Sequence, residues 1–213
     1  IREQFGLECM SAEAALDGAP VVVLAVPDTL VGRVASQIVP TLKPGTIVVI
    51  LDAAAPYAGH LPERADITYF VTHPCHPPIF NDETDPAARA DHFGGVAAKQ
   101  HIVNALMQGP DEHYALGEAV ARTIWAPVMR SHRVTVEQIA ILEPGLSETV
   151  CATLLDAMRE AMEEAIARGV PREAARDFLL GHMNILAAVT FKHIDGVFSD
   201  ACNKAIVYES EER

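Results

Sequence analysis

Two histidines stand three residues apart in the stretch THPCHPP near the middle of the chain. The residues before them, Ile67–Thr72, alternate as in a buried strand, and the prolines end that strand because they lack a backbone N–H. His73 and His76 are therefore predicted to emerge at the carboxyl end of a strand, where open α/β sheets bind ligands. Imidazole is a general base near neutral pH and a metal ligand. Both are candidate catalytic residues, with His73 favoured; the alternative is a pair of structural histidines.

A carboxylate in an unfavourable place is the second chemical signal. Glu143 ends an apolar helical pattern and precedes a proline, although the dipole at a helix C-terminus disfavours a negative charge. Such a side chain needs a partner, and we predict a divalent metal shared with His73; a structural role is an equally good reading. Glu148 begins the next predicted helix, where the dipole already favours an acid. Cys75 is expected neither to be a nucleophile nor to complete a zinc site, which needs four ligands.

Three polar residues in the second half of the chain are weaker candidates. Lys204, in the segment SDACNKAI, is a candidate catalytic residue because an ammonium group binds a substrate carboxylate; the alternative is a solvated lysine. His182 and Asn184 interrupt the otherwise apolar segment Phe178–Phe191 of a predicted helix, Pro171–His193, that is expected to be buried. Their preferred reading is as core polar groups that are hydrogen-bonded to neighbours.

The elements that position these residues change in character along the chain. Up to residue 107, apolar strands alternate with a helix and loops, a spacing typical of βαβ units and a parallel sheet. The fold class is therefore α/β, with a sheet domain in residues 1–108 and an all-helical domain in residues 109–213. No strand is expected after Met107, and Pro144-Gly145 is expected to separate two helices. The predicted strands are Val21–Val26, Thr46–Leu51, Ile67–Thr72 and Lys99–Met107, and the main predicted helices are Asp111–Trp125, Thr135–Leu142, Glu148–Arg168 and Pro171–His193.

Composition excludes several classes of partner. The formal net charge is −13, from 29 acidic against 16 basic residues, so nucleic acid and anionic membrane surfaces are not expected to be bound. No apolar run approaches the roughly 18 residues of a membrane-spanning helix, and no signal peptide is expected. The four cysteines are scattered without a CxxC pair. This pattern predicts reduced thiols and a cytoplasmic protein.

Several stretches together suggest a family. The segments VVVLAVPD and LKPGTIVVILDAA, followed by THPCHPPIFNDE and ILEPGLSETVCATLLDAMREA, resemble the 6-phosphogluconate dehydrogenase-like superfamily. That superfamily includes β-hydroxyacid dehydrogenases, ketol-acid reductoisomerases and D-apionate oxidoisomerases. The resemblance implies a parallel Rossmann-type sheet that binds NAD or NADP. It also implies a helical C-terminal domain through which a homodimer forms.

The resemblance also implies residues for the cofactor. Ala25, Val26 and Pro27 follow a strand and are expected to lie along the ribose and nicotinamide of the dinucleotide. Asp52 closes the next strand and is expected to face the nicotinamide pocket or substrate hydroxyls; a turn-capping role is the alternative. The family's G-x-G-x-x-G turn, which holds the pyrophosphate, is not found in these 213 residues. We therefore expect the first strand and this turn to lie before Ile1.

Together these readings predict an NAD-dependent oxidoreductase that acts on a small polyhydroxy carboxylic acid such as D-apionate. His73 or His76 takes the hydroxyl proton, and in the oxidoisomerase version a divalent metal on His73 and Glu143 acts as a Lewis acid. Two alternatives stay open. One is a simple β-hydroxyacid dehydrogenase without a metal, and the other is a non-catalytic dimerisation or regulatory protein.

Overall fold

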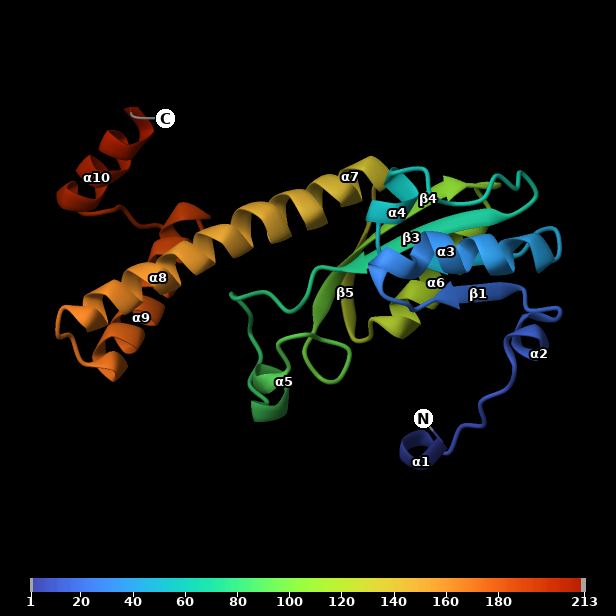
Figure 1. Cartoon of the computed structure of the whole chain (residues 1–213). Coiled ribbons are helices and arrows are strands. Elements are labelled where there is room, and N and C mark those ends of the chain that lie inside the picture. Colours follow the sequence, from blue (N-terminus) through green and yellow to red (C-terminus); the bar gives the residue numbers. More distant parts are fainter. Residues whose placement is uncertain (1, 212–213) are drawn as a thin grey trace. The chain divides into compact units, whose positions relative to one another are not determined.

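A computed structural model describes residues 2–211 and divides the chain into two compact units (Figure 1). Unit 1 comprises the residues up to Pro78 together with Glu83–Val150. Unit 2 comprises Ile79–Asp82 and the residues from Cys151 onward. The sheet-bearing unit therefore continues beyond residue 108, where the sequence analysis places the domain boundary.

Unit 1 contains a five-stranded sheet with the order β1-β2-β3-β4-β5. The strands are β1 Val21–Leu24, β2 Ile47–Ile50, β3 Thr68–Pro74, β4 Gln100–Gln108 and β5 Val128–Arg133. The helices are α1 Arg2–Phe5, α2 Ala12–Leu16, α3 Asp28–Ile38, η1 Val39–Thr41, α4 Ala54–Tyr57, α5 Pro86–Ala90, α6 His113–Ile124 and α7 Val136–Ala140, and η2 Ile141–Ala152 leads into unit 2.

The predicted parallel arrangement is confirmed for the first three strands, which pair in parallel. β4 runs antiparallel to β3, and β5 runs parallel to β4. The prediction that no strand follows Met107 is wrong, because Val128–Arg133 form β5. This strand lies at the edge of the described sheet and is largely solvated. Its residues VMRSHR therefore lack the apolar alternation by which strands are recognised in a sequence.

The register of the parallel strands brings Asp52 and His73 to one edge of the sheet. Ile50 of β2 pairs with Val71 of β3. Asp52 lies two residues after Ile50, and His73 lies two residues after Val71. Because side chains alternate between the faces of a strand, we expect both to point to the face that Ile50 and Val71 share.

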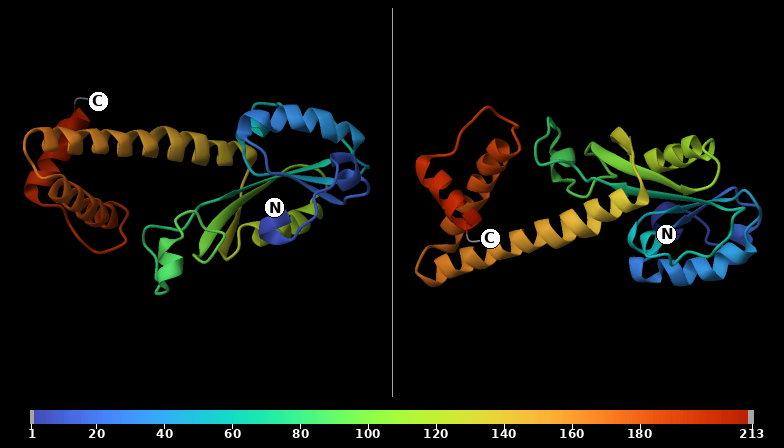
Figure 2. Two further views of the ribbon diagram at one scale, coloured as in Figure 1. Left: turned by 60° about the horizontal axis from the view of Figure 1, so that its bottom comes forward. Right: turned by 90° about the horizontal axis from the view of Figure 1, so that it is seen from above.

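Helices cover both faces of the sheet. The face with Ile50 and Val71 packs against α3, α4 and α7, and the opposite face packs against α6. Figure 2 shows α3 and α6 on opposite sides of the strands. α6 approaches the sheet closely because Gly117 has no side chain: a Cβ built there would lie 2.4 Å from the Phe70 ring. The core thus lies between the sheet and these helices, and the carboxyl edge of β2 and β3 borders it.

Unit 2 consists of helices α8 Thr153–Ala167, α9 Arg172–Thr190 and α10 Asp200–Glu211. α8 ends before Gly169, whose φ of +99° is in the range that favours glycine. Arg172 then donates two hydrogen bonds of 2.7 Å to Glu163, which tie the start of α9 to α8. None of the described helices combines the length and apolar character needed to cross a bilayer.

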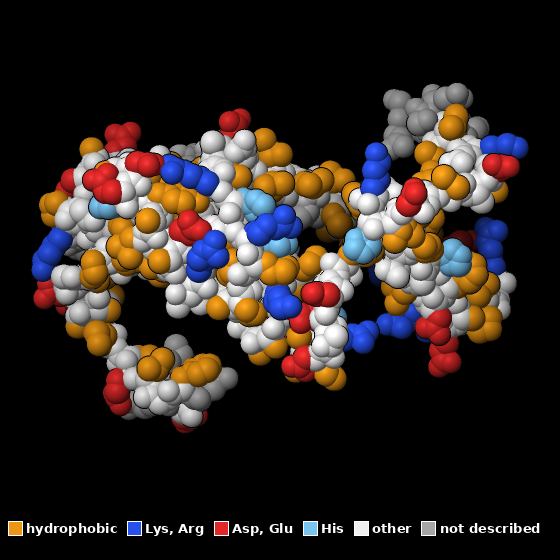
Figure 3. Space-filling view, turned by 180° about the vertical axis from the view of Figure 1, so that it is seen from behind, with side chains coloured by type: hydrophobic (Ala, Val, Ile, Leu, Met, Phe, Trp, Pro, Cys, Tyr) orange, Lys and Arg blue, Asp and Glu red, His pale blue; other side chains and the backbone are white. Residues whose placement is uncertain are grey.

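Two predictions about the helices are wrong. Pro144-Gly145 does not end a helix, because the chain stays helical through Ile141–Ala152 as a π-helix. The helix predicted over Pro171–His193 forms as α9, but most of it is not buried in the single chain. Phe178 is 69% exposed and Ile185 is 48% exposed, and Figure 3 shows many hydrophobic side chains at the surface.

Candidate active site

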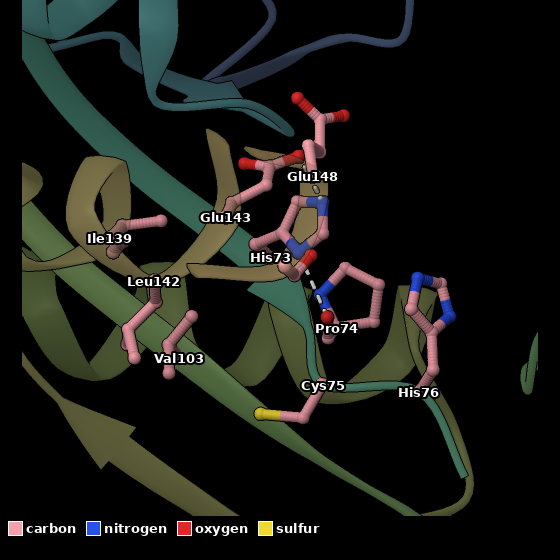
Figure 4. A pocket seen from close by; sticks show the side chains of 10 residues that line it. His73, Pro74, Cys75, His76, Val103, Ile139, Leu142, Glu143 and Glu148 are labelled. Carbon is pink, nitrogen blue, oxygen red and sulfur yellow. Dashed lines mark hydrogen bonds and ion pairs between the residues drawn. The ribbon is translucent and has the colours of Figure 1, made fainter. Parts of the chain in front are cut away.

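His73 and Glu143 contact each other directly. The His73 Nε2 atom lies 2.7 Å from Glu143 Oε1, and both side chains are largely shielded from solvent. His73 is at the end of β3, and Glu143 is in the first turn of η2. Figure 4 shows the two side chains facing each other, with the dashed line between them. The histidine and the carboxylate that the sequence singles out therefore meet, and both belong to unit 1 rather than to two separate domains.

The protonation of this pair follows from its partners. His73 Nδ1 lies 2.8 Å from the Pro74 carbonyl oxygen, which can only accept, so Nδ1 carries a proton and donates it. Nε2 faces a carboxylate and therefore also needs a proton. Burial alone lowers the pKa of His73, but the hydrogen bond and charge of Glu143, the Pro74 carbonyl and the charge of Asp52 together raise it above its usual value. The contacts of the pair therefore favour the protonated form of His73.

Asp52 is the third member of the group. Its side chain accepts a 2.7 Å hydrogen bond from the backbone N–H of Ala54, so it also closes the turn that leads into α4, in line with the alternative reading of the sequence. The residue is only 7% exposed. Burial raises the pKa of its carboxyl, and the neighbouring Glu143 carboxylate raises it further, against the Ala54 hydrogen bond and the charge of His73. Two acids and one histidine thus share a poorly solvated space.

A π-helix carries Glu143 into this space. Pro144 has no N–H to donate, and in an α-helix its ring would collide with the carbonyl four residues earlier. The wider turn of a π-helix relieves this conflict, and such turns are frequent at functional sites. The Thr149 hydroxyl donates a 2.6 Å hydrogen bond to the Pro144 carbonyl. Pro144, which in the sequence predicts a helix end, therefore lies inside the π-helix that directs the Glu143 side chain toward His73.

A pocket of about 410 Å³ opens beside the pair. His76 lies at its wall with a φ of +60°, a conformation that is uncommon for a residue other than glycine. Its Nδ1 lies 2.8 Å from the Phe93 carbonyl oxygen, and its ring meets that of His73 edge to face. In Figure 4 the Cys75 sulfur points away from the His73 ring. The lining residues are His73, Pro74, Cys75, His76, Val103, Ile139, Leu142, Glu143, Ser147 and Glu148.

Cys75 is not prepared as a nucleophile. Desolvation raises the pKa of its thiol, which disfavours the thiolate that reacts. The sequence analysis did not identify Val103, Ile139 or Ser147 as part of the pocket. Val103 and Ile139 are apolar residues that give no chemical signal, and only the packing of α7 against β4 brings them here. Ser147 reaches the pocket on η2, a π-helix that the sequence did not predict.

The other predicted site residues lie elsewhere. Ala25, Val26 and Pro27 follow β1, at the same edge of the parallel strands as Asp52. Lys204 is exposed on α10 of unit 2. His182 is also exposed rather than a core residue: its ring stacks on Phe178 at 4.0 Å between centroids, and Asn184 is exposed nearby on α9.

The chemistry of the site suits a divalent cation in part. Within residues 2–211, no group of three or more His, Cys, Asp or Glu side chains is already arranged as a metal site. However, Glu143 Oε2 is buried without a hydrogen-bond partner, which is unusual for a carboxylate oxygen. It lies beside Asp52, a second carboxylate with a raised pKa. A cation would satisfy the free oxygen and relieve the repulsion between the two acids.

Comparisons with known proteins define the relationships of the chain. Residues 81–212 match the family model of the phosphogluconate dehydrogenase (decarboxylating) C-terminal domain. The chain is 71% identical to the D-apionate oxidoisomerase of Rhizobium rhizogenes over 98% of this chain and 76% of that protein. It is 47% identical to the D-apionate oxidoisomerase of Blautia hydrogenotrophica over 94% of this chain and 71% of that protein.

Solved structures lead to the same relationships. One described as a semialdehyde dehydrogenase NAD-binding protein from Cupriavidus necator, in complex with calcium and NAD, is 69% identical with a TM-score of 0.95, over 98% of this chain and 75% of that chain. An NADH-preferring ketol-acid reductoisomerase from an uncultured archaean is 19% identical with a TM-score of 0.65, over 99% of this chain and 63% of that chain. The latter similarity concerns the fold alone.

The fold, the family match and the similarity to an NAD-bound structure place the chain among the NAD-dependent oxidoreductases of the 6-phosphogluconate dehydrogenase-like superfamily. Within that superfamily, the chain belongs to the family of the D-apionate oxidoisomerases. The predictions of superfamily, of fold class and of an NAD(P)-dependent enzyme are therefore confirmed.

Proposed function

We propose that this protein oxidises D-apionate with NAD and rearranges the carbon skeleton of the oxidised product. The observation that carries the proposal is the His73–Glu143 pair, at 2.7 Å, in a chain of this family. Oxidation of a carbinol removes a hydride from carbon and a proton from the hydroxyl oxygen. Rearrangement then moves a carbon substituent to the neighbouring carbon, without any net change in oxidation state.

His73 and Glu143 are the acid–base unit in this proposal. His73 first loses its Nε2 proton to solvent, and the freed Nε2 then accepts the proton of a substrate hydroxyl that approaches from the pocket. The Pro74 carbonyl keeps Nδ1 protonated throughout, so Nε2 is the nitrogen that exchanges protons. Glu143 stabilises the imidazolium that results. His76 at the pocket wall orients the substrate.

Two groups would be held by residues of the chain. Ala25, Val26 and Pro27 would lie along the nicotinamide side of NAD, which supplies a hydride acceptor when bound. Glu143 would hold a divalent cation together with Asp52, and the cation would supply Lewis-acid polarisation of the substrate oxygens. His73, which the sequence analysis also predicts as a ligand, cannot offer Nε2 to the cation while Nε2 accepts the proton, because the Pro74 carbonyl holds Nδ1. The buried, unpartnered Glu143 Oε2 supports this assignment.

Turnover with D-apionate tests the function. We expect the intact protein to form reduced nicotinamide with D-apionate, and magnetic resonance of the product to show a rearranged carbon skeleton. Removal of metal ions with a chelator should lower kcat by about a hundredfold, reversed by Mg²⁺, Mn²⁺ or Ca²⁺. An unrearranged product, together with turnover that is insensitive to the chelator, would instead identify a simple β-hydroxyacid dehydrogenase.

We also propose a homodimer that forms through unit 2. A groove of about 580 Å³ between α8 and α9 is lined almost entirely by apolar side chains, Phe178 among them. An apolar surface of this kind is stabilised when a partner covers it. Phe178→Asp should shift the protein from dimer to monomer in sedimentation analysis. Phe93→Asp changes a residue of unit 1 that is 82% exposed and should leave the dimer intact; dissociation by Phe93→Asp alone would contradict the proposed interface.

We expect that the protein binds neither nucleic acid nor a membrane. The net charge of −13 supports both. All four cysteines are unpaired in the structure, which supports a reducing, cytoplasmic location.

A further inference from the structure

A group of cationic and imidazole side chains lies on the sheet face that carries His73. Arg130 of β5 pairs in register with His101 of β4, and His132 pairs with Val103. Arg130 Nη2 lies 3.4 Å from His101 Nε2. The rings of His101 and His132 meet edge to face, with centroids 6.1 Å apart. The three side chains therefore form one cluster across two strands.

This cluster adjoins the pocket. Val103, which lines the pocket, pairs with His73 on one side and with His132 on the other. The backbone N–H of Cys75, another lining residue, donates a 2.9 Å hydrogen bond to the His101 carbonyl. Neighbouring strands lie about 4.8 Å apart, and β4 lies between β3 and β5, so the backbone of His132 is about 10 Å from the backbone of His73. None of the three cluster residues lines the pocket itself, so a substrate bound to Arg130 must extend from the pocket across Val103.

The cluster carries the positive charge of Arg130, and no described carboxylate neutralises that charge. Burial, and then the charges of Arg130 and His132, lower the pKa of His101, so its neutral Nε2 can accept a hydrogen bond from Arg130. In the part of the chain that the structure describes, no ion pair joins Arg130 to a carboxylate. Arg133, on the other face of the same strand, pairs with Asp111, and Arg122 pairs with Glu118. In a chain of net charge −13, Arg130 is therefore a local site of attraction for anions.

We propose that Arg130 binds the carboxylate of the substrate and so turns its hydroxyl-bearing carbons toward His73 and Glu143. A guanidinium group matches a carboxylate with two parallel hydrogen bonds, which fixes orientation as well as position. His101 holds the guanidinium from the side of the sheet. The proposal rests on the proposed function, because it assigns a binding group for the acid that the enzyme oxidises.

The test compares Arg130→Gln with Arg133→Gln, which removes the same charge from the opposite face of β5. We expect Arg130→Gln to raise the KM for D-apionate about ten- to a hundredfold while kcat changes little, and Arg130→Lys to recover part of the loss. Arg133→Gln should leave both constants close to those of the unchanged protein. Calorimetric titration of the NAD-saturated protein with D-apionate gives the Kd for the same variants, so that binding is judged apart from turnover.

The outcomes separate the two proposals. An unchanged KM and Kd in Arg130→Gln, or an equal rise in Arg133→Gln, overturns the carboxylate site and leaves the function standing. If the unchanged protein binds D-apionate without turning it over, the proposed function fails, and the Kd values alone decide the role of Arg130. If it neither binds nor oxidises D-apionate, both proposals are overturned.

Discussion

Replacing His73 with alanine is expected to lower the kcat for D-apionate about a thousandfold, with little change in NAD binding. In the proposed mechanism Nε2 is the nitrogen that takes the hydroxyl proton, since Nδ1 is held by the Pro74 carbonyl. Without it, water must accept the proton. Steady-state kinetics with saturating NAD measure kcat, and titration of the fluorescence of reduced nicotinamide measures cofactor affinity.

The matched control is His92→Ala, which removes an exposed imidazole that does not line the pocket. It should retain full activity. Comparable thermal unfolding of the two variants shows that the loss is chemical rather than structural. Normal turnover by His73→Ala would remove the assigned role and would turn attention to His76.

Replacing Glu143 with glutamine is expected to lower kcat about a hundredfold and to shift its pH dependence. The hydrogen bond and charge of Glu143 are the main causes that raise the pKa of His73 against the effect of burial. With glutamine the charge is lost and burial dominates, so the pKa of His73 falls. Because His73 must be deprotonated to act as a base, the acidic limb of the kcat/KM profile should move to lower pH.

The same shift affects stability, with a definite sign. The pKa of His73 is raised in the folded protein, so the contribution of the ion pair to stability is fully present below the unfolded value of about 6.5. It is lost as the pH rises through the folded pKa. Chemical denaturation at several pH values should show this loss in the unchanged protein, and Glu143→Gln should reduce it.

Glu137→Gln is the control for this variant, because Glu137 is an exposed acid in α7, the helix that precedes Glu143. It should leave the pH profile in place. A profile that is the same for Glu143→Gln and the unchanged protein would show that the pair does not govern the base. A shift toward higher pH would contradict the sign of the interaction.

Local patterns were sufficient to predict the first strands and to single out His73 and Glu143. Apolar runs of strand length predict β1, β2 and β3, the first and third of them ended by prolines and the second by Asp52, because such runs have few alternatives in a soluble protein. Glu143 is a candidate site residue because an acid at the end of an apolar helical pattern opposes the helix dipole. β5 was not predicted, because an edge strand of polar residues has no apolar alternation in its sequence.

The sequence by itself determined the chemistry that is available: a histidine at the end of β3, an acid before Pro144 and the family of NAD-dependent enzymes. It could not determine that the helix continues through Pro144 as a π-helix, since a proline normally indicates a helix end. It also could not show that Arg130 and His101 lie beside the pocket. Both facts depend on which strands pair and on how α7 packs against β4, and these are long-range contacts that no local pattern encodes.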